Sequence, residues 1–213
     1  MASTRLLRVQ HQRRLSWMPW LYFTLKPRHR VWAEAWQKRI RERLERLETV
    51  RIHPTAFIAP EARIFAEPGR AIEVGPGAYV AAFAFVHGPV KLEQGVSVNA
   101  GVSMDGGSAG ILIGSGARIA SGASLYAFDH GMASDRPIRE QPVRSRGIDI
   151  GREVWIGARA GITDGVRIGD HAVVGMGAVV TTDVDAGMRV GGVPARPLRG
   201  SAASLGASDQ SET

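Results

Sequence analysis

The 213-residue chain contains no cysteine. A disulfide framework, a cysteine-ligated zinc site and a thiol nucleophile are therefore excluded, and redox chemistry does not fix the compartment. Long apolar runs are also missing: the longest near the N-terminus, residues 15–25, is too short to span a bilayer, and no signal peptide precedes it. We expect a cytoplasmic protein with a single core.

Acidic residues are scarce at the N-terminal end. Residues 1–49 hold 12 Lys and Arg against 4 Glu, a net charge of +8, whereas the remainder holds 15 against 16, a net charge of −1. The excess positive charge thus belongs to one end of the chain. A nucleic-acid-binding surface over the whole fold is not expected.

The N-terminal part divides into two segments. Residues 1–30 mix arginines with aromatic side chains, and Pro19 and Pro27 interrupt any long helix, so we interpret them as a basic aromatic arm. Residues 31–50 carry hydrophobic side chains at helical spacing and predict an amphipathic helix. These are Trp32, Trp36, Ile40, Leu44 and Leu47. The helix either docks on protein or, with the arm, makes a peripheral contact with the inner membrane. At the other end, the small polar residues 200–213 predict a disordered tail.

Residues 51–199 repeat with a period of six. An aliphatic residue recurs at Ile52, Ile58 and Ile64, at Val74, Val80, Val86, Leu92, Val98 and Met104, at Ile113, Ile119 and Leu125, and at Ile150, Ile156, Ile162, Ile168, Val174 and Val180. A period of six fits neither an α-helix nor an ordinary sheet. It predicts an all-β solenoid, a parallel β-helix in which three hexapeptides make one coil and stacked coils bury a continuous core.

The repeat stops over residues 128–147, which predicts a loop extruded from one face of the solenoid. His130 lies at its base. Because the pKa of histidine is near neutrality, His130 is a candidate general base; the alternative is a loop histidine that only makes a hydrogen bond. His87, His130 and His171 show no paired spacing that suggests a zinc site.

Several motifs occur in a fixed order along residues 74–199. They are Val98-Asn99-Ala100-Gly101, Ile113-Gly114, Leu125-Tyr126 to His130, Val154-Trp155-Ile156-Gly157, Gly165-Val166-Arg167-Ile168-Gly169-Asp170, Val179-Val180-Thr181-Thr182-Asp183-Val184 and Gly191-Gly192-Val193-Pro194-Ala195-Arg196. With the repeat and the loop, they resemble the hexapeptide-repeat acetyltransferases, above all the maltose and galactoside O-acetyltransferase branch. The resemblance implies a left-handed β-helix, acetyl-CoA as co-substrate, no metal, and a homotrimer with active sites between neighbouring prisms.

The resemblance also implies roles for individual residues. His130 matches the general base, and Asn99 matches the asparagine that hydrogen-bonds the acceptor. Trp155 matches an aromatic residue beside the site; its alternative is a tryptophan that fills a position between coils. Asp105 is a second acceptor-side candidate; its alternative is a turn residue before Gly106-Gly107. The coenzyme A candidates are Ala158, Met176 and Thr181 for the pantetheine and adenine ends and Arg196 and Arg199 for the phosphates.

We therefore expect an O-acetyltransferase that acts on a saccharide or glycoconjugate hydroxyl, in surface polysaccharide biosynthesis. No aspartate precedes Asp105, so an acidic residue that contacts the acceptor sugar near the N-terminus in the maltose and galactoside enzymes has no counterpart here. The alternatives are an N-acetyltransferase of an amino sugar, a metal-dependent hydratase on the same fold, and a non-catalytic scaffold.

Overall fold

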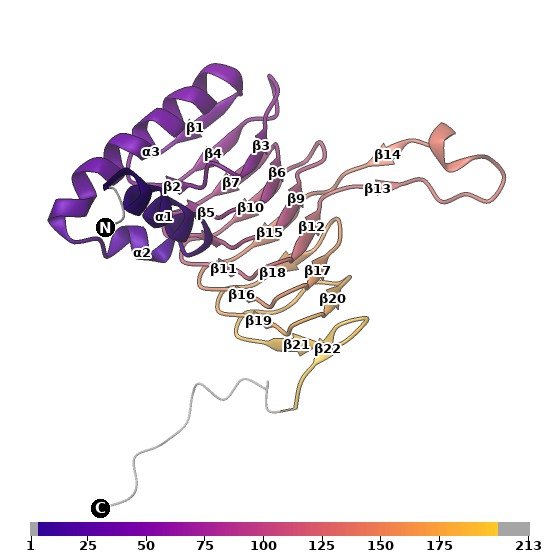
Figure 1. Ribbon diagram of the computed structural model, residues 1–213. Coiled ribbons are helices and arrows are strands. Elements are labelled where there is room, and N and C mark those ends of the chain that lie inside the picture. Colours follow the sequence, from indigo (N-terminus) through magenta and orange to yellow (C-terminus); the bar gives the residue numbers. More distant parts are fainter. Residues whose placement is uncertain (1–3, 200–213) are drawn as a thin grey trace, which may run out of the picture.

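The computed structural model describes residues 4–199 (Figure 1). Three N-terminal helices precede a solenoid of short parallel strands, and a long hairpin leaves the solenoid after its fourth coil. The predicted all-β parallel β-helix with an N-terminal helical extension is confirmed. The tail predicted for residues 200–213 lies outside the described residues.

Each coil contributes one strand to each of three sheets, here called A, B and C. Sheet A contains β1 (Val50–Ile52), β4 (Ile72–Val74), β7 (Val90–Leu92), β10 (Ile111–Ile113), β15 (Ile148–Ile150) and β18 (Arg167–Ile168). Sheet B contains β2 (Phe57–Ile58), β5 (Tyr79–Val80), β8 (Ser97–Val98), β11 (Arg118–Ile119), β16 (Trp155–Ile156), β19 (Val173–Val174), β21 (Arg189–Gly191) and, antiparallel at its end, β22 (Arg196–Pro197). Sheet C contains β3 (Arg63–Phe65), β6 (Phe85–His87), β9 (Ser103–Asp105), β12 (Ser124–Tyr126), β17 (Gly161–Ile162) and β20 (Val179–Val180).

The repeat residues fill the interior of this triangular prism. Ile150, Ile156 and Ile162 succeed one another around one coil and are each at most 2% exposed. Burying a side chain of this size stabilises the fold by about 1.5–3 kcal/mol. Because one such residue enters the interior at every sixth position, a single hydrophobic core runs along the solenoid.

The N-terminal helices are α1 (Thr4–Trp17), α2 (Trp20–Phe23) and α3 (Pro27–Leu47). The segment interpreted as an arm therefore contains two helices, and α3 begins at Pro27 rather than at residue 31. Proline suits this first helical position because its fixed φ is helical and its missing N–H would have no partner there. No helix within residues 4–199 is long and apolar enough to cross a bilayer.

Helix α3 lies against the first coil (Figure 1). Its Gln37 is fully buried, and the side-chain amide donates to the carbonyl of Ile58 (3.0 Å) and accepts from the N–H of Ile58 (2.9 Å). These two hydrogen bonds pair the backbone N–H and C=O of Ile58, which have no neighbouring strand at this end of sheet B. Beside it, Trp36, Tyr22 and Leu15 pack against the outward face of sheet B around Phe57.

Candidate functional site

One edge of the prism carries three of the predicted site residues. We call it the B–C corner, where the chain passes from sheet B to sheet C, and it comprises residues 99–101, 120–122, 157–159 and 175–177. Asn99, Ala158 and Met176 lie on it in the third, fifth and sixth coils. Backbone hydrogen bonds link its successive coils, from Gly122 to Ala100 (3.2 Å), from Arg159 to Ser121 (3.1 Å) and from Gly177 to Ala158 (2.9 Å).

The corner is tight at its C-terminal end. A Cβ at Gly157 would lie 2.5 Å from the backbone nitrogen of Met176, so only glycine allows the fifth and sixth coils to approach this closely. The side chain of Met176 points away from the coils and is 79% exposed. Between Asn99 and Met176 the corner therefore presents small residues, backbone groups and the exposed side chain of Arg159 to a ligand.

Asn99 is held by two hydrogen bonds. Its Nδ2 donates to the carbonyl of Ile119 (2.9 Å), and its Oδ1 accepts from the hydroxyl of Tyr79 (3.2 Å). An amide has two N–H donors and an oxygen with two lone pairs, so one donor and one lone pair stay available. The side chain is thus oriented in advance and retains hydrogen-bonding capacity for an acceptor.

Trp155 stands on the outer face of sheet B. It pairs in register with Arg118 and Val173, and its side chain is 55% exposed. The alternative in which this tryptophan fills a position between coils is wrong, because the inward position belongs to Ile156. Its indole is instead accessible on the sheet that leads to the B–C corner.

His130 lies on the extruded hairpin formed by β13 (Asp129–His130) and β14 (Val143–Arg144), with a short 3₁₀ helix, Ile138–Glu140, near its tip. The imidazole is exposed and lies edge-on to Phe128, with ring centroids 6.1 Å apart. A hollow of about 580 Å³ beside it is lined by residues that include Arg136, Arg144 and Arg146. The predicted loop therefore has regular structure.

Two polar residues fix the hairpin's shape. Near the tip, the buried Gln141 accepts from the N–H of Ala133 (2.8 Å) and donates to the carbonyls of Ala133 (2.8 Å) and Arg136 (3.0 Å). At the base, the 3%-exposed Asp164 accepts from the N–H groups of Arg146 (2.8 Å) and Gly147 (2.9 Å). His130, paired with Val143, lies between these two points of the hairpin.

The hairpin leaves the solenoid after β12, at the corner between sheets C and A (Figure 1). Asn99 lies at the opposite edge of sheet C. Within residues 4–199 of one chain, no hydrogen bond, ion pair or ring contact joins His130 to Asn99 or to any residue of the B–C corner. His130 and Asn99 therefore lie at different corners of the prism in one chain.

Asp105 belongs to a separate cluster at the corner between sheets C and A. Its carboxylate lies 3.0 Å from Nδ1 of His87 and 3.4 Å from a guanidinium nitrogen of Arg70, and it accepts from the N–H of Gly107 (3.0 Å). Nε2 of His87 lies 3.2 Å from Glu67. Asp105 thus serves as a turn residue through its hydrogen bond from Gly107, and it does not lie beside Asn99.

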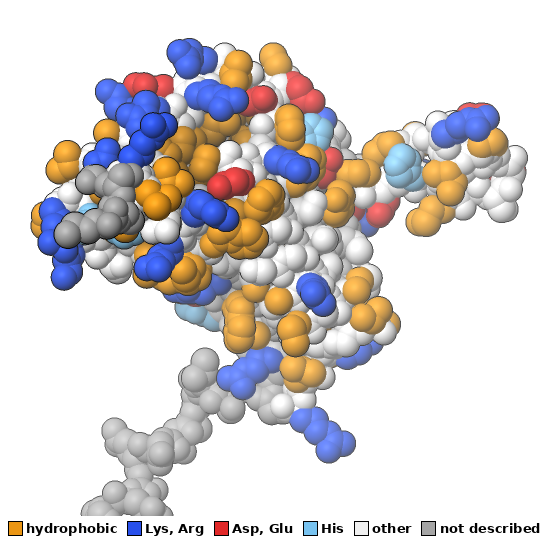
Figure 2. Space-filling model, viewed as in Figure 1, with side chains coloured by type: hydrophobic (Ala, Val, Ile, Leu, Met, Phe, Trp, Pro, Cys, Tyr) orange, Lys and Arg blue, Asp and Glu red, His pale blue; other side chains and the backbone are white. Residues whose placement is uncertain are grey.

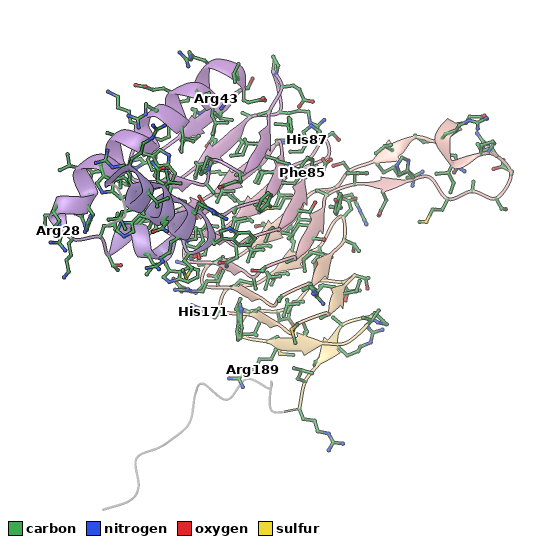
Figure 3. The ribbon with its side chains drawn as sticks, in the orientation of Figure 1. Arg28, Arg43, Phe85, His87, His171 and Arg189 are labelled. Atoms are coloured by element: carbon green, nitrogen blue, oxygen red, sulfur yellow. The ribbon has the colours of Figure 1, made fainter. Side chains whose placement is uncertain are left out.

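This cluster raises the pKa of His87 above its ordinary value of 6.5, chiefly through the hydrogen bond with Asp105. The pKa of Glu67 is lowered, chiefly through its hydrogen bond with His87. Figure 3 shows His87 beside Phe85 on the side of the solenoid from which the hairpin leaves. This pairing was not predicted from the sequence, although the 18-residue spacing of His87 and Asp105 places both in register on neighbouring coils.

The remaining coenzyme A candidates lie at the C-terminal end. Thr181 is exposed directly after β20, and the segment that follows β21 returns beside β20 through a hydrogen bond from Ala195 to Val179 (2.7 Å). Arg196, on β22, and Arg199 are both exposed. These residues therefore stand on the same end of the prism as Met176.

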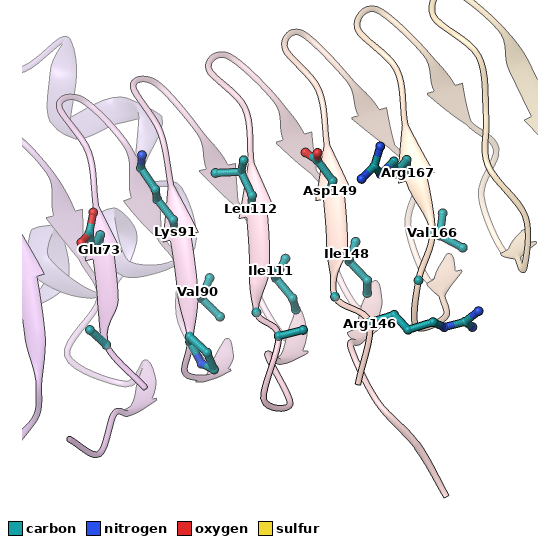
Figure 4. A pocket seen from close by; sticks show the side chains of 16 residues that line it. Glu73, Val90, Lys91, Ile111, Leu112, Arg146, Ile148, Asp149, Val166 and Arg167 are labelled. Carbon is teal, nitrogen blue, oxygen red and sulfur yellow. The ribbon is translucent and has the colours of Figure 1, made fainter. Parts of the chain in front are cut away.

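A further hollow, of about 480 Å³, lies over the outer face of sheet A (Figure 4). Its charged side chains alternate in sign along the strand register, in the order Glu73, Lys91, Asp149 and Arg167, with Leu112 between the second and third. Opposite charges thus lie side by side, and none of the predicted site residues is there. Within residues 4–199, no group of three His, Asp or Glu side chains is arranged to hold a metal ion.

The fold is a parallel β-helix built from six-residue repeats, and comparisons with known proteins agree with it. The family model described as the hexapeptide repeat of succinyl-transferase matches residues 147–182. Chloramphenicol acetyltransferase of Morganella morganii is 37% identical over 106 residues, which are 42% of this chain and 50% of that protein. Galactoside O-acetyltransferase of Escherichia coli K12 is 35% identical over 95 residues, 42% of this chain and 43% of that protein. The chain thus spans about half the length of the curated relatives it matches.

Among solved structures, a mutant of AntD, an N-acyltransferase from Bacillus cereus, in complex with dTDP-4-amino-4,6-dideoxyglucose and coenzyme A, aligns with a TM-score of 0.65 and 25% identity. The alignment covers 74% of this chain and 87% of that one. The predicted resemblance is confirmed: this chain is similar to hexapeptide-repeat acetyltransferases.

Proposed function

We propose that the protein is an acetyl-CoA-dependent O-acetyltransferase that acts on a hydroxyl of a saccharide or glycoconjugate. The observation that carries this proposal is the order of Asn99, Ala158 and Met176 along the B–C corner. An extended co-substrate that follows the corner has its reacting end at Asn99 and its distal end near the last coil. The names of the acetyltransferase relatives support the same activity.

Acetyl-CoA is the proposed donor. Ala158, Met176 and Thr181 would contact its pantetheine and adenine ends, and the exposed guanidinium groups of Arg196 and Arg199 would bind its phosphates by charge-assisted hydrogen bonds. The coenzyme A bound to AntD supports this choice. Trp155 would form an apolar wall beside the reacting centre.

His130 is the proposed general base. Its neutral imidazole takes the proton of the acceptor hydroxyl while the hydroxyl oxygen attacks the thioester carbonyl. When the carbon–sulfur bond breaks, the imidazolium returns the proton to the sulfur, and coenzyme A leaves as the free thiol. Asn99 places the acceptor through the donor and lone pair that its own contacts leave available.

We propose a homotrimer in the cytoplasm as the working form. His130 and Asn99 lie at different corners of one prism, so the hairpin of one chain has to reach the B–C corner of its neighbour. His130 lies on the first strand of this hairpin, β13, and so projects from its own prism on the side where a neighbour would pack. The exposed hydrophobic side chains of the hairpin, Met132, Ile138 and Val143, are available to pack on that neighbour.

A second candidate is N-acetylation of an amino sugar, favoured by the amino-sugar nucleotide bound to AntD. The B–C corner serves both reactions, since an amine attacks the same carbonyl. Hydroxyl and amine versions of one saccharide, compared as substrates, separate the two candidates.

Calorimetric titration with coenzyme A and acetyl-CoA tests the donor. We expect saturable binding by the assembled protein, weakened in the Arg196→Ala and Arg199→Ala variants.

In acetyl-transfer assays, His130→Ala should lower kcat by about 10²- to 10⁴-fold and retain coenzyme A binding. His171→Gly is the matched control, because His171 is exposed at another corner with a φ of 60° that glycine adopts freely. Absence of coenzyme A binding by the unaltered protein refutes the proposed function. Full turnover by a folded His130→Ala variant contradicts the role of His130 as general base.

A further inference from the structure

The chain up to the start of α3 carries an excess of positive charge. Residues 1–33 contain seven Lys and Arg and no Asp or Glu. Within the part of the chain that the structure describes, none of the seven side chains forms an ion pair with a carboxylate. Figure 2 shows Lys and Arg side chains crowded over these helices, interleaved with hydrophobic ones.

Three of these cations line a hollow between the helices. It has a volume of about 290 Å³, and its lining includes Arg14, Lys26 and Arg28 together with His11 and His29. No acidic side chain contributes to it. The pKa of His29 is lowered by desolvation and by the neighbouring Arg28, His11 and Lys26. The hollow therefore combines a concave shape with an excess of positive charge, which suits a phosphate group.

Aromatic side chains are exposed on the same helices. Trp17 is 53%, Trp20 47% and Phe23 36% exposed. The ring centroids of Trp17 and Phe83 are 5.5 Å apart, and Phe83 is itself 50% exposed on the solenoid. Exposed aromatic side chains in such a group indicate an interaction surface, and Trp and Phe beside cations are the composition of helices that lie in a membrane interface.

We infer that α1, α2 and the start of α3 form a docking surface for an anionic phospholipid bilayer, with a lipid headgroup phosphate in the hollow lined by Arg14, Lys26 and Arg28. Charge complementarity selects this occupant: residues 50–213 of a second copy carry a net charge of only −1 and offer little attraction to seven cations. The inference concerns where the protein works and is independent of the proposed transfer reaction.

Co-sedimentation of the full chain with vesicles tests the surface. We expect binding to vesicles of phosphatidylcholine and phosphatidylglycerol in equal parts, little binding to phosphatidylcholine alone, and a fall in binding as NaCl is raised. Lys26→Gln with Arg28→Gln should weaken binding by about fivefold for each cation removed. Trp20→Ala should weaken it further, because the side chain that enters the interface is lost.

The matched control is Arg43→Gln with Arg46→Gln, which removes the same charge from the opposite end of α3, where Glu42 and Glu45 lie alongside. This control should bind like the unaltered protein. Equal binding to both kinds of vesicle, no binding to either, or an equal loss in the two double variants overturns the inference. So does a loss of self-association in Lys26→Gln with Arg28→Gln, measured by light scattering, since it assigns the surface to a second copy.

Discussion

The hydroxyl of Tyr79 donates a hydrogen bond to Oδ1 of Asn99 across 3.2 Å. Tyr79 is 6% exposed, and its ring is fixed between the N-terminal helices and sheet B. Its hydroxyl therefore couples the helical segment to the orientation of the asparagine that we assign to the acceptor. The helices influence the site although they lie outside the solenoid.

Tyr79→Phe should loosen Asn99 and spare the coenzyme A end. We expect the KM for the acceptor to rise about fivefold, which corresponds to one lost hydrogen bond of roughly 1 kcal/mol, with an unchanged Kd for coenzyme A. Steady-state kinetics and calorimetry measure the two quantities. Tyr126→Phe is the control, because it removes a hydroxyl that bonds Ser103 instead. Equal effects of the two variants contradict the role of Tyr79.

Gln141→Ala should separate activity from stability. The side chain of Gln141 makes three hydrogen bonds within the hairpin, whereas the solenoid core is packed without it. We expect kcat/KM to fall by about tenfold or more because His130 is no longer held in place, with an unchanged thermal midpoint. Faster amide exchange confined to residues 128–147 should accompany the loss. Full activity despite faster exchange would show that the hairpin need not be rigid.

The cluster of Glu67, His87, Asp105 and Arg70 predicts a pH dependence of stability. The raised pKa of His87 means that its contribution is complete below 6.5 and is lost as the pH rises through the folded-state pKa. The lowered pKa of Glu67 means that its contribution is present above 4.5 and is lost as the pH falls through the folded-state pKa. The cluster should therefore stabilise most between about pH 4.5 and 6.5.

Urea denaturation of the wild type and His87→Gln at several pH values measures this dependence. The difference in unfolding free energy between the two proteins should shrink as the pH rises above 6.5, because the wild type then loses the charged imidazole. A difference that stays constant from acidic to alkaline pH contradicts the assignment.

The solenoid could be predicted from the sequence because its periodicity and burial coincide. Ile150 and Ile156 recur at six residues and are fully buried, which follows from three short faces per 18-residue coil. The outward position of Trp155 was implicit in the same register, since it precedes an inward Ile156. The axial order of Asn99, Ala158 and Met176 also follows from counting coils.

Side-chain contacts between coils, and contacts in the proposed homotrimer, could not be predicted from the sequence repeat. The pairing of His87 with Asp105 depends on side-chain directions at one corner, and the three-residue insertion between β9 and β10 hides the spacing further along. The helices within residues 4–23 show no clear apolar stripe in the sequence. They are stabilised by packing on Phe57 and Tyr79, which the sequence pattern alone does not reveal. A meeting of His130 with Asn99 would depend on a neighbouring chain of the proposed homotrimer.

Gln37 makes contacts that the sequence pattern does not predict, and these contacts lead to a prediction about stability. It looks like one more polar residue of an amphipathic helix, yet it is fully buried and satisfies both backbone groups of Ile58. Gln37→Ala leaves a buried N–H and a buried C=O without partners, so we expect a loss of about 3 kcal/mol of unfolding free energy. Gln10→Ala, on the exposed part of α1, should change it little. Urea denaturation compares the two variants. A small effect of Gln37→Ala would mean that water reaches the end of sheet B and that α3 covers the first coil less tightly than the hydrogen bonds to Ile58 indicate.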